Sequence, residues 1–285
     1  MNPQLINELK KLRNEMAHGL APVDPAKLAE RLKSLGISIP TEQLPDLIPT
    51  ILQAFGGRNA GHLHVPPVLS DVVAKLLDNR SARTICDPWA GLGTMLAIAQ
   101  RATSSRRCIA FNLNASEGEL AKALFPQVEW SIGQPLTLLS KLNDPIDVFV
   151  SCLPFGARTN ESLELADTSG NLVELKDDLG NLILAAAMAR LSDNGVGIFV
   201  VPTSFFFAER SVLKRFAELG FNVDAALALP PGSFAPYASI STYLLALTKS
   251  PKKPMFVAQL SSDPNTNSQI LTNFANGVEG GAIEL

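Results

Sequence analysis

Four residues in one short segment have the types and spacing of a ligand-binding turn: Asp87, Pro88, Gly91 and Gly93. An apolar run ends at the acid, and a second apolar run over residues 95–99 follows the glycines. This order predicts a strand, a tight turn and a helix in an open sheet. Glycine lacks a Cβ, so the backbone can approach a ligand closely, and the first N–H groups of the helix face the same crevice. The segment predicts a nucleotide pocket, although a plain strand-to-helix turn has the same glycine pattern.

Composition limits what surrounds this turn. The chain has 285 residues, 46% of them hydrophobic, which suits one large domain or one domain with a small helical appendage. Its formal net charge is −3, so it lacks the basic footprint of an autonomous nucleic-acid binder, and any DNA contact must be local or shared with a partner.

Cysteine and histidine usage bears on metals and on compartment. Cys86, Cys108 and Cys152 are spaced too widely for a zinc pattern and are odd in number, which is typical of reduced thiols in a cytoplasmic protein. His62 and His64 lack further ligands nearby, so we expect no metal site. No basic leader and no apolar run of about 18 residues is present, so we expect neither export nor membrane spanning.

The region ahead of the turn reads as helical. Apolar residues recur at helical spacing over residues 2–18, 25–35 and 41–55, which predicts three short helices. We expect them to cover the core; docking to a partner is the alternative. We divide the chain into a helical N-terminal region over residues 1–56, a main domain over 57–260, and a loose tail over 261–285 that is rich in Ser, Asn and Gly.

Strand-like and helical segments alternate after the turn. We expect strands over residues 107–112, 128–132, 146–151 and 196–201, and helices over 115–124, 179–191 and 211–219. This alternation predicts an α/β fold with a mainly parallel sheet covered by helices on both faces. Strands over residues 221–229 and 241–248 follow each other without a helix and should pair antiparallel.

Several motifs in this order resemble one known family. The pattern Asp-Pro-x-x-Gly-x-Gly of residues 87–93 is similar to the first motif of S-adenosylmethionine (SAM)-dependent methyltransferases, above all those that methylate the exocyclic amine of adenine in DNA. Residues 229–234 and the Thr-bearing strand after them resemble the modification subunits of type I restriction-modification systems. The resemblance covers roughly residues 56–249. It implies a Rossmann-like methyltransferase fold, SAM as cofactor, and adenine-specific DNA methylation with a separate specificity subunit or a second copy of the chain.

The resemblance also implies which residues bind the cofactor. His64 and Pro66 take the place of a turn that lies over the cofactor. Asn112 ends the second strand, where such folds carry an acceptor for the ribose hydroxyls. Gln134 follows the third strand, where the family binds the adenine amino group, and a surface turn residue is the alternative. The methionine end would face the segment containing Asp87, Pro88, Gly91 and Gly93.

The family ends its fourth strand in a side-chain oxygen, two prolines and an aromatic residue, which activate and stack the target base. Here these places hold Cys152, Leu153, Pro154 and Phe155. The Leu153 carbonyl and the Phe155 ring keep their functions, but a thiol is a poor acceptor. Ser151 supplies an oxygen one position early, and strand alternation should turn it away. A nucleophilic Cys152 is an alternative, although no neighbouring charge would lower its pKa.

Two hypotheses follow. The first is a SAM-dependent adenine methyltransferase domain that reads DNA through a partner. The second is a catalytically degenerate module that binds SAM or serves structural interactions, because Asn112, Gln134, Cys152 and Leu153 all depart from the family pattern. Residues 158–178 carry two basic against six acidic residues, so we expect a solvated loop that repels phosphates unless it folds away or meets a partner.

Overall fold

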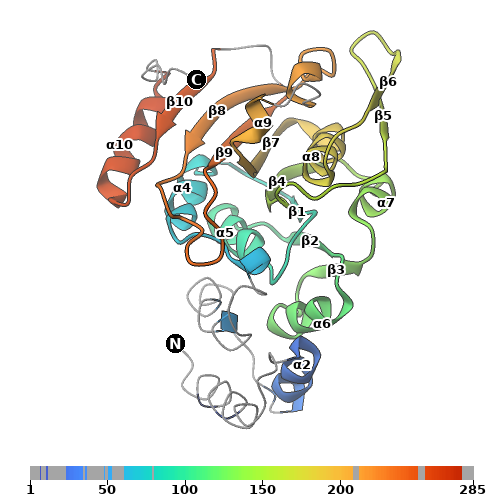
Figure 1. Cartoon of the computed structure of the whole chain (residues 1–285), viewed down its shortest axis with the longest axis vertical. Helices are drawn as coiled ribbons and strands as arrows, with labels where there is room; N and C mark the ends of the chain where they lie inside the picture. The colour runs from blue at the N-terminus through green and yellow to red at the C-terminus, as the bar shows by residue number, and fades with distance from the viewer. Residues whose placement is uncertain are drawn as a thin grey trace.

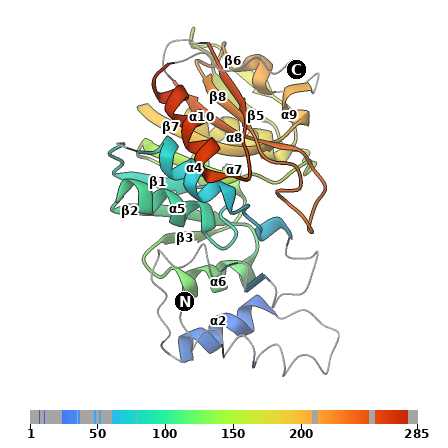
Figure 2. The ribbon, with the colours of Figure 1, turned by 90° about the vertical axis from the view of Figure 1, so that its left-hand side faces the viewer.

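The computed structural model describes residues 24–34, 61–78, 80–207, 212–249 and 254–277, together with residues 7, 11, 36, 48, 51 and 52. The helices expected over 2–18 and 41–55 lie almost entirely outside these residues. The helix expected over 25–35 is confirmed as α2 (Pro25–Ser34), which buries Leu28 and Leu32. Figures 1 and 2 both show it beside α6 (Ala115–Leu124), where Lys33 forms an ion pair with Glu119.

One mostly parallel sheet forms the centre of the described structure, as the sequence predicts (Figure 1). Its strand order is β10-β8-β9-β7-β4-β1-β2-β3, and only β9 runs antiparallel to its neighbours, β7 and β8. The order reverses beside β1, because β2 and β3 lie on one side and β4 on the other; ligands of open α/β sheets bind at the carboxyl ends of strands near such a point. The strands are β1 (Thr84–Asp87), β2 (Arg107–Asn112), β3 (Glu129–Ile132), β4 (Ile146–Cys152), β7 (Leu191–Pro202), β8 (Asn222–Ala228), β9 (Thr242–Thr248) and β10 (Phe256–Gln259).

Helices cover both faces of the sheet, and two hydrophobic clusters fill the space between the layers. One cluster packs α2 and α6 together with α4 (Val68–Leu76), α5 (Thr94–Thr103) and α10 (Pro264–Ala275). The other packs α7 (Pro135–Ser140), α8 (Leu179–Ala189), α9 (Ser204–Phe207) and the 3₁₀ turn η3 (Val212–Arg215). α8 is apolar except for Asn181 and buries every residue from 180 to 188, as expected of a helix enclosed on all sides.

The acidic segment over residues 158–178 forms a hairpin rather than the expected loop. β5 (Leu163–Ala166) and β6 (Leu172–Leu175) pair antiparallel as a separate two-stranded sheet. Their alternation buries Val173 and Leu175 and leaves Glu164 and Glu174 exposed directly opposite each other. The segment therefore packs on the core through one face and presents like charges on the other.

The expectation of a loose tail is wrong for residues 264–275, which form α10. The carboxylate of Asp263 accepts hydrogen bonds from the backbone N–H groups of Asn265 and Thr266, and Pro264 occupies the first turn, so a cap and a proline start the helix. Leu271 is buried, and α10 packs against α4 (Figure 1). The domain boundaries at 56 and 260 stay predictions, and residues 278–285 lie outside the described part.

The helix expected over residues 211–219 is also wrong in extent. Within the described residues, the segment contains only the 3₁₀ turn η3, followed by turns up to Gly220. The apolar positions that suggested a longer helix are used for burial, since Val212, Phe216 and Leu219 all enter the second cluster.

Candidate functional site

The turn after β1 depends on its two glycines. Gly91 and Gly93 have φ angles of 52° and 84°, in the left-handed region that other residues rarely adopt. A Cβ at Gly91 would lie 3.1 Å from a methyl group of Leu63, and one at Gly93 would lie 3.3 Å from the ring of Trp130. The space that a Cβ would take at each glycine is therefore bounded by the chain's own side chains.

Asp87 at the end of β1 is buried and hydrogen-bonded. The Ser151 hydroxyl donates to its Oδ1 over 2.7 Å, and the N–H of Trp89 donates to the same atom over 3.0 Å. Burial raises the pKa of Asp87 to about 7, and the two hydrogen bonds oppose the shift. Ser151 on β4 thus faces the acid on β1, and its orientation relative to the target base stays a prediction.

A cavity of about 410 Å³ opens at the carboxyl ends of β1 and β2. Trp89, Phe111 and Leu113 give it apolar walls, and Leu113 is 44% exposed. Such walls suit a flat ring with polar groups at its edge. Its lining residues are His62, Trp89, Gly91, Phe111, Asn112, Leu113, Asn114 and Glu117.

Asn112 lines this cavity, but its amide is used inside the protein. Its Nδ2 donates a hydrogen bond to the carbonyl of Gly91 over 2.9 Å, and its Oδ1 accepts one from the N–H of Asn114 over 2.8 Å. The residue is 5% exposed. Asn112 therefore clamps the glycine turn to the start of α6, so half of its hydrogen-bonding capacity is used inside the protein, and its burial restricts access of a ribose to the rest.

His64 contacts the loop between β8 and β9. Its Nε2 lies 3.2 Å from the carbonyl of Ser233, so this nitrogen carries the hydrogen and donates. Its ring meets Phe234 at a centroid distance of 5.9 Å and Tyr237 at 5.0 Å. Burial lowers the pKa of His64, and the hydrogen bond to Ser233 opposes the shift. A neutral His64 thus fastens the segment before α4 to this loop.

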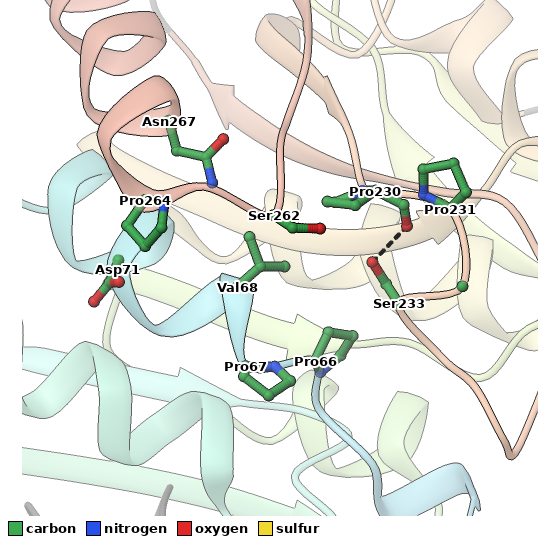
Figure 3. A pocket seen from close by; sticks show the side chains of 11 residues that line it. Pro66, Pro67, Val68, Asp71, Pro230, Pro231, Ser233, Ser262, Pro264 and Asn267 are labelled. Carbon is green, nitrogen blue, oxygen red and sulfur yellow. Dashed lines mark hydrogen bonds between the residues drawn. The ribbon is translucent and has the colours of Figure 1, made fainter.

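Pro66 belongs to a second cavity, which lies between the start of α4, the β8–β9 loop and the start of α10 (Figure 3). Five prolines line it: Pro66, Pro67, Pro230, Pro231 and Pro264. Ser233, which also lines it, donates a hydrogen bond to the carbonyl of Pro230 over 2.6 Å (Figure 3). The structure therefore separates Pro66 from the cavity that contains Gly91 and Asn112.

The turn after β4 holds the residues expected at the target base. Burial raises the pKa of Cys152 to about 12, and the nearby charge of Asp87 adds to the shift, so the thiol stays protonated at neutral pH. This argues against a nucleophilic Cys152. Leu153 is buried and its N–H donates to the carbonyl of Val200 over 3.4 Å. The ring of Phe155 meets Phe234 edge to face at 5.2 Å.

Gln134, which was expected at the cofactor's adenine, is exposed before the first turn of α7 and is not among the residues that line either cavity. Six lining residues are not assigned to a cofactor site from the sequence: His62, Trp89, Phe111, Leu113, Asn114 and Glu117. Trp89 and Leu113 follow the ends of β1 and β2 by one or two residues, a position that could have singled them out. Glu117 stands three residues after Asn114, a spacing typical of a helix start, which indicates its place in a first turn but no ligand contact.

Within the described ranges, no group of three or more His, Cys, Asp or Glu side chains could bind a metal ion. In the same residues, no helix has both the length and the apolar character needed to cross a bilayer.

Comparison with known proteins gives a consistent result. The model of a family described as N-6 DNA methylase matches residues 42–275. The type I restriction enzyme EcoEI methylase subunit of Escherichia coli is 25% identical over 221 residues, which cover 70% of this chain but only 44% of that subunit.

Solved structures also share the fold. One is a putative class I S-adenosylmethionine-dependent methyltransferase from Listeria monocytogenes, with a TM-score of 0.70, 18% identity, and coverage of 96% of this chain and 98% of that one. Another is a modification subunit of a putative type I restriction enzyme from Vibrio vulnificus, with a TM-score of 0.67, 16% identity, and coverage of 84% and 59%.

Proposed function

The chain belongs to the N-6 DNA methylase family, and from this premise we propose that it is a SAM-dependent methyltransferase domain acting on the exocyclic amine of adenine in DNA. One observation carries the proposal. The glycine turn follows β1 and the turn of Cys152 to Phe155 follows β4, and these strands are adjacent and parallel, with Ile85 paired to Val148. A methyl donor at the first turn and an acceptor at the second would therefore be neighbours, as direct transfer requires.

The residues around the glycine turn fit an adenosyl cofactor. The cavity at the ends of β1 and β2 has flat apolar walls in Trp89 and Phe111 and a polar rim, which suits an adenosine. At the start of α5, the hydroxyl of Thr94 is buried without a hydrogen-bond partner among the described residues, beside the free N–H groups of the first turn. That position suits a carboxylate such as the one of the methionine end. Asp87 would face the cofactor's amino group.

SAM supplies a methyl group on a positively charged sulfur. The chain's own residues orient the acceptor. The carbonyl of Leu153 accepts one hydrogen of the adenine amine and directs the nitrogen toward the donor, while the ring of Phe155 stacks on the extruded base. Phe234 fixes that ring from the β8–β9 loop. The thiol of Cys152 accepts hydrogen bonds weakly, so we expect slow transfer.

A second candidate is favoured by Cys152 itself. The side chain at the acceptor position is a thiol, and burial raises its pKa to about 12. Asn112 uses both polar groups of its amide in bonds within the protein. A chain with these properties can retain the fold and the cofactor cavity without transferring a methyl group. The second candidate is therefore a SAM-binding module that acts through interaction.

DNA recognition would require a partner, and we propose a separate specificity subunit or a second copy of the chain. The net charge is −3, and the hairpin beside the β4 turn exposes Glu164 opposite Glu174. Phosphates are attracted by clustered Lys and Arg, so these surfaces disfavour unaided duplex binding. Three free cysteines are consistent with a reducing compartment, and we place the protein in the cytoplasm.

The two candidates are separated by supplying an adenine that needs no extrusion. A single-stranded oligonucleotide containing adenine and SAM labelled on its methyl group should give labelled N6-methyladenine, and Phe155→Ala should reduce the yield by removing the stacking ring. Binding of SAM in a calorimeter without any transferred label would reject the enzyme and support the binding module. Absence of both would reject both candidates.

A further inference from the structure

Glu117 brings a carboxylate to the cavity at the ends of β1 and β2. Its side chain is 12% exposed, and Oε1 lies 2.8 Å from Nε2 of His62. Both residues line the cavity, although His62 belongs to the segment before α4 and Glu117 to the first turn of α6. Among the residues that line this cavity, Glu117 is the one carboxylate.

A series of backbone caps fixes Glu117 relative to the end of β2. The N–H of Asn114 donates to Oδ1 of Asn112, and the N–H of Glu117 donates to Oδ1 of Asn114 over 3.2 Å. Gly118 then lets α6 approach the sheet, because a Cβ there would lie 2.9 Å from the side chain of Ile132. The position of the carboxylate is thus built into the fold rather than left to a mobile surface chain.

The chemistry of the site calls for such a group. A ribose presents two adjacent hydroxyl donors, and a carboxylate has two oxygens with about four acceptor positions, so it can accept both while keeping its contact with His62. The residue at the usual place, Asn112, already donates to Gly91 and accepts from Asn114.

We propose that Glu117, oriented by His62, accepts the ribose hydroxyls of the adenosyl cofactor and so takes over the function expected of Asn112. The inference rests on the proposed function, because it requires an adenosyl group in this cavity. The competing explanation is that the Glu117 to His62 contact only braces α6 against the segment before α4. That explanation gives the ribose hydroxyls no part in binding.

The test is calorimetric titration with S-adenosylhomocysteine, which carries the same adenosine. We expect Glu117→Gln to weaken binding about tenfold or more, since a charge-assisted hydrogen bond is lost. The matched control is Glu119→Gln on the same helix. The carboxylate of Glu119 pairs with Lys33 and Lys122 outside the cavity, so this variant should bind S-adenosylhomocysteine with the affinity of the wild type. Unchanged affinity of Glu117→Gln would overturn the inference.

A second comparison begins with the wild type alone, so its first result does not depend on how well the variant folds. The 2′,3′-dideoxy analogue of S-adenosylhomocysteine, which lacks both ribose hydroxyls, should bind the wild type about tenfold or more weakly than S-adenosylhomocysteine does. Glu117→Gln should bind the two ligands with nearly equal affinity, because the variant and the analogue each remove one side of the same contact. Equal affinity of the wild type for both ligands, or equal losses in both proteins, would reject the inference alone. A wild type that binds neither ligand would instead reject the cofactor site and the proposed function with it.

Discussion

The hydroxyl of Ser151 donates a 2.7 Å hydrogen bond to the buried carboxylate of Asp87 and so joins the end of β4 to the end of β1. Each of these strands leads into one of the two turns proposed for methyl transfer. The bond therefore couples the position of the cofactor turn to that of the acceptor turn, and both its energy and its pH dependence can be measured.

Removing this donor should destabilise the protein most when Asp87 is charged. We expect Ser151→Ala to lower the free energy of unfolding by about 1–3 kcal/mol at pH 8 and by less at pH 5, where Asp87 is protonated. Urea denaturation at the two pH values measures this. The control is Ser140→Ala, because that hydroxyl donates to the carbonyl of Thr137 at the surface. Equal losses at both pH values would contradict the role assigned to the pair.

Asp87 should also make stability fall as pH rises. Its pKa is about 7 in the folded protein against an ordinary 3.8, so the folded state retains a proton that the unfolded state releases. The contribution of this proton to the free energy of unfolding is complete below about pH 4 and is lost as pH rises through about 7. The free energy of unfolding of Asp87→Asn, relative to that of the wild type, should therefore increase over that pH range by at most roughly 4 kcal/mol. The control is Asp71→Asn, because Asp71 is exposed. If the free energies of unfolding of the wild type and Asp87→Asn change with pH in parallel, Asp87 does not have the raised pKa assigned to it.

The same ionisation predicts how cofactor affinity changes with pH. A positively charged amino group of SAM binds the ionised form of Asp87 better, so affinity should rise several-fold between pH 6 and 7.5. In Asp87→Asn the affinity should be lower and nearly independent of pH over this range. Calorimetric titrations of both proteins with SAM provide the measurement, and the same pH dependence in both would show that Asp87 does not meet the cofactor.

Restoring a side-chain oxygen at the acceptor position should speed up methyl transfer. Cys152→Asn adds a carbonyl acceptor beside that of Leu153, and we expect the rate on single-stranded DNA to increase about tenfold or more. Cys152→Ala should behave like the wild type, since the thiol stays protonated and accepts weakly. Loss of all transfer in Cys152→Ala would instead mean that the thiol takes part in the reaction.

The layered fold could be predicted because apolar periodicity reflects burial directly. The strands β2, β4 and β9 each contain an uninterrupted apolar run that is buried, and α8 is apolar except for Asn181. The hairpin of β5 and β6 was missed because each strand has four residues and half of them face solvent. α10 was missed because its composition is polar, whereas its start depends on a local cap at Asp263.

The site could be predicted only in part, for a different physical reason. Sequence position located Asp87, Gly91 and Asn112 at strand ends, but the partner of each polar group depends on three-dimensional contacts. The bond from Asn112 to the carbonyl of Gly91 joins residues 21 positions apart, and the contact of Glu117 with His62 joins residues 55 apart. No pattern within one element reports such pairs.

The central claim is that the cavity at the ends of β1 and β2 receives the adenosyl group of the cofactor. The most direct measurement is a crystal structure of the chain grown with S-adenosylhomocysteine. We predict adenine against the walls formed by Trp89 and Leu113, and ribose beside Glu117. A ligand bound only in the proline-lined cavity of Figure 3, or no ligand at saturating concentration, would contradict the account.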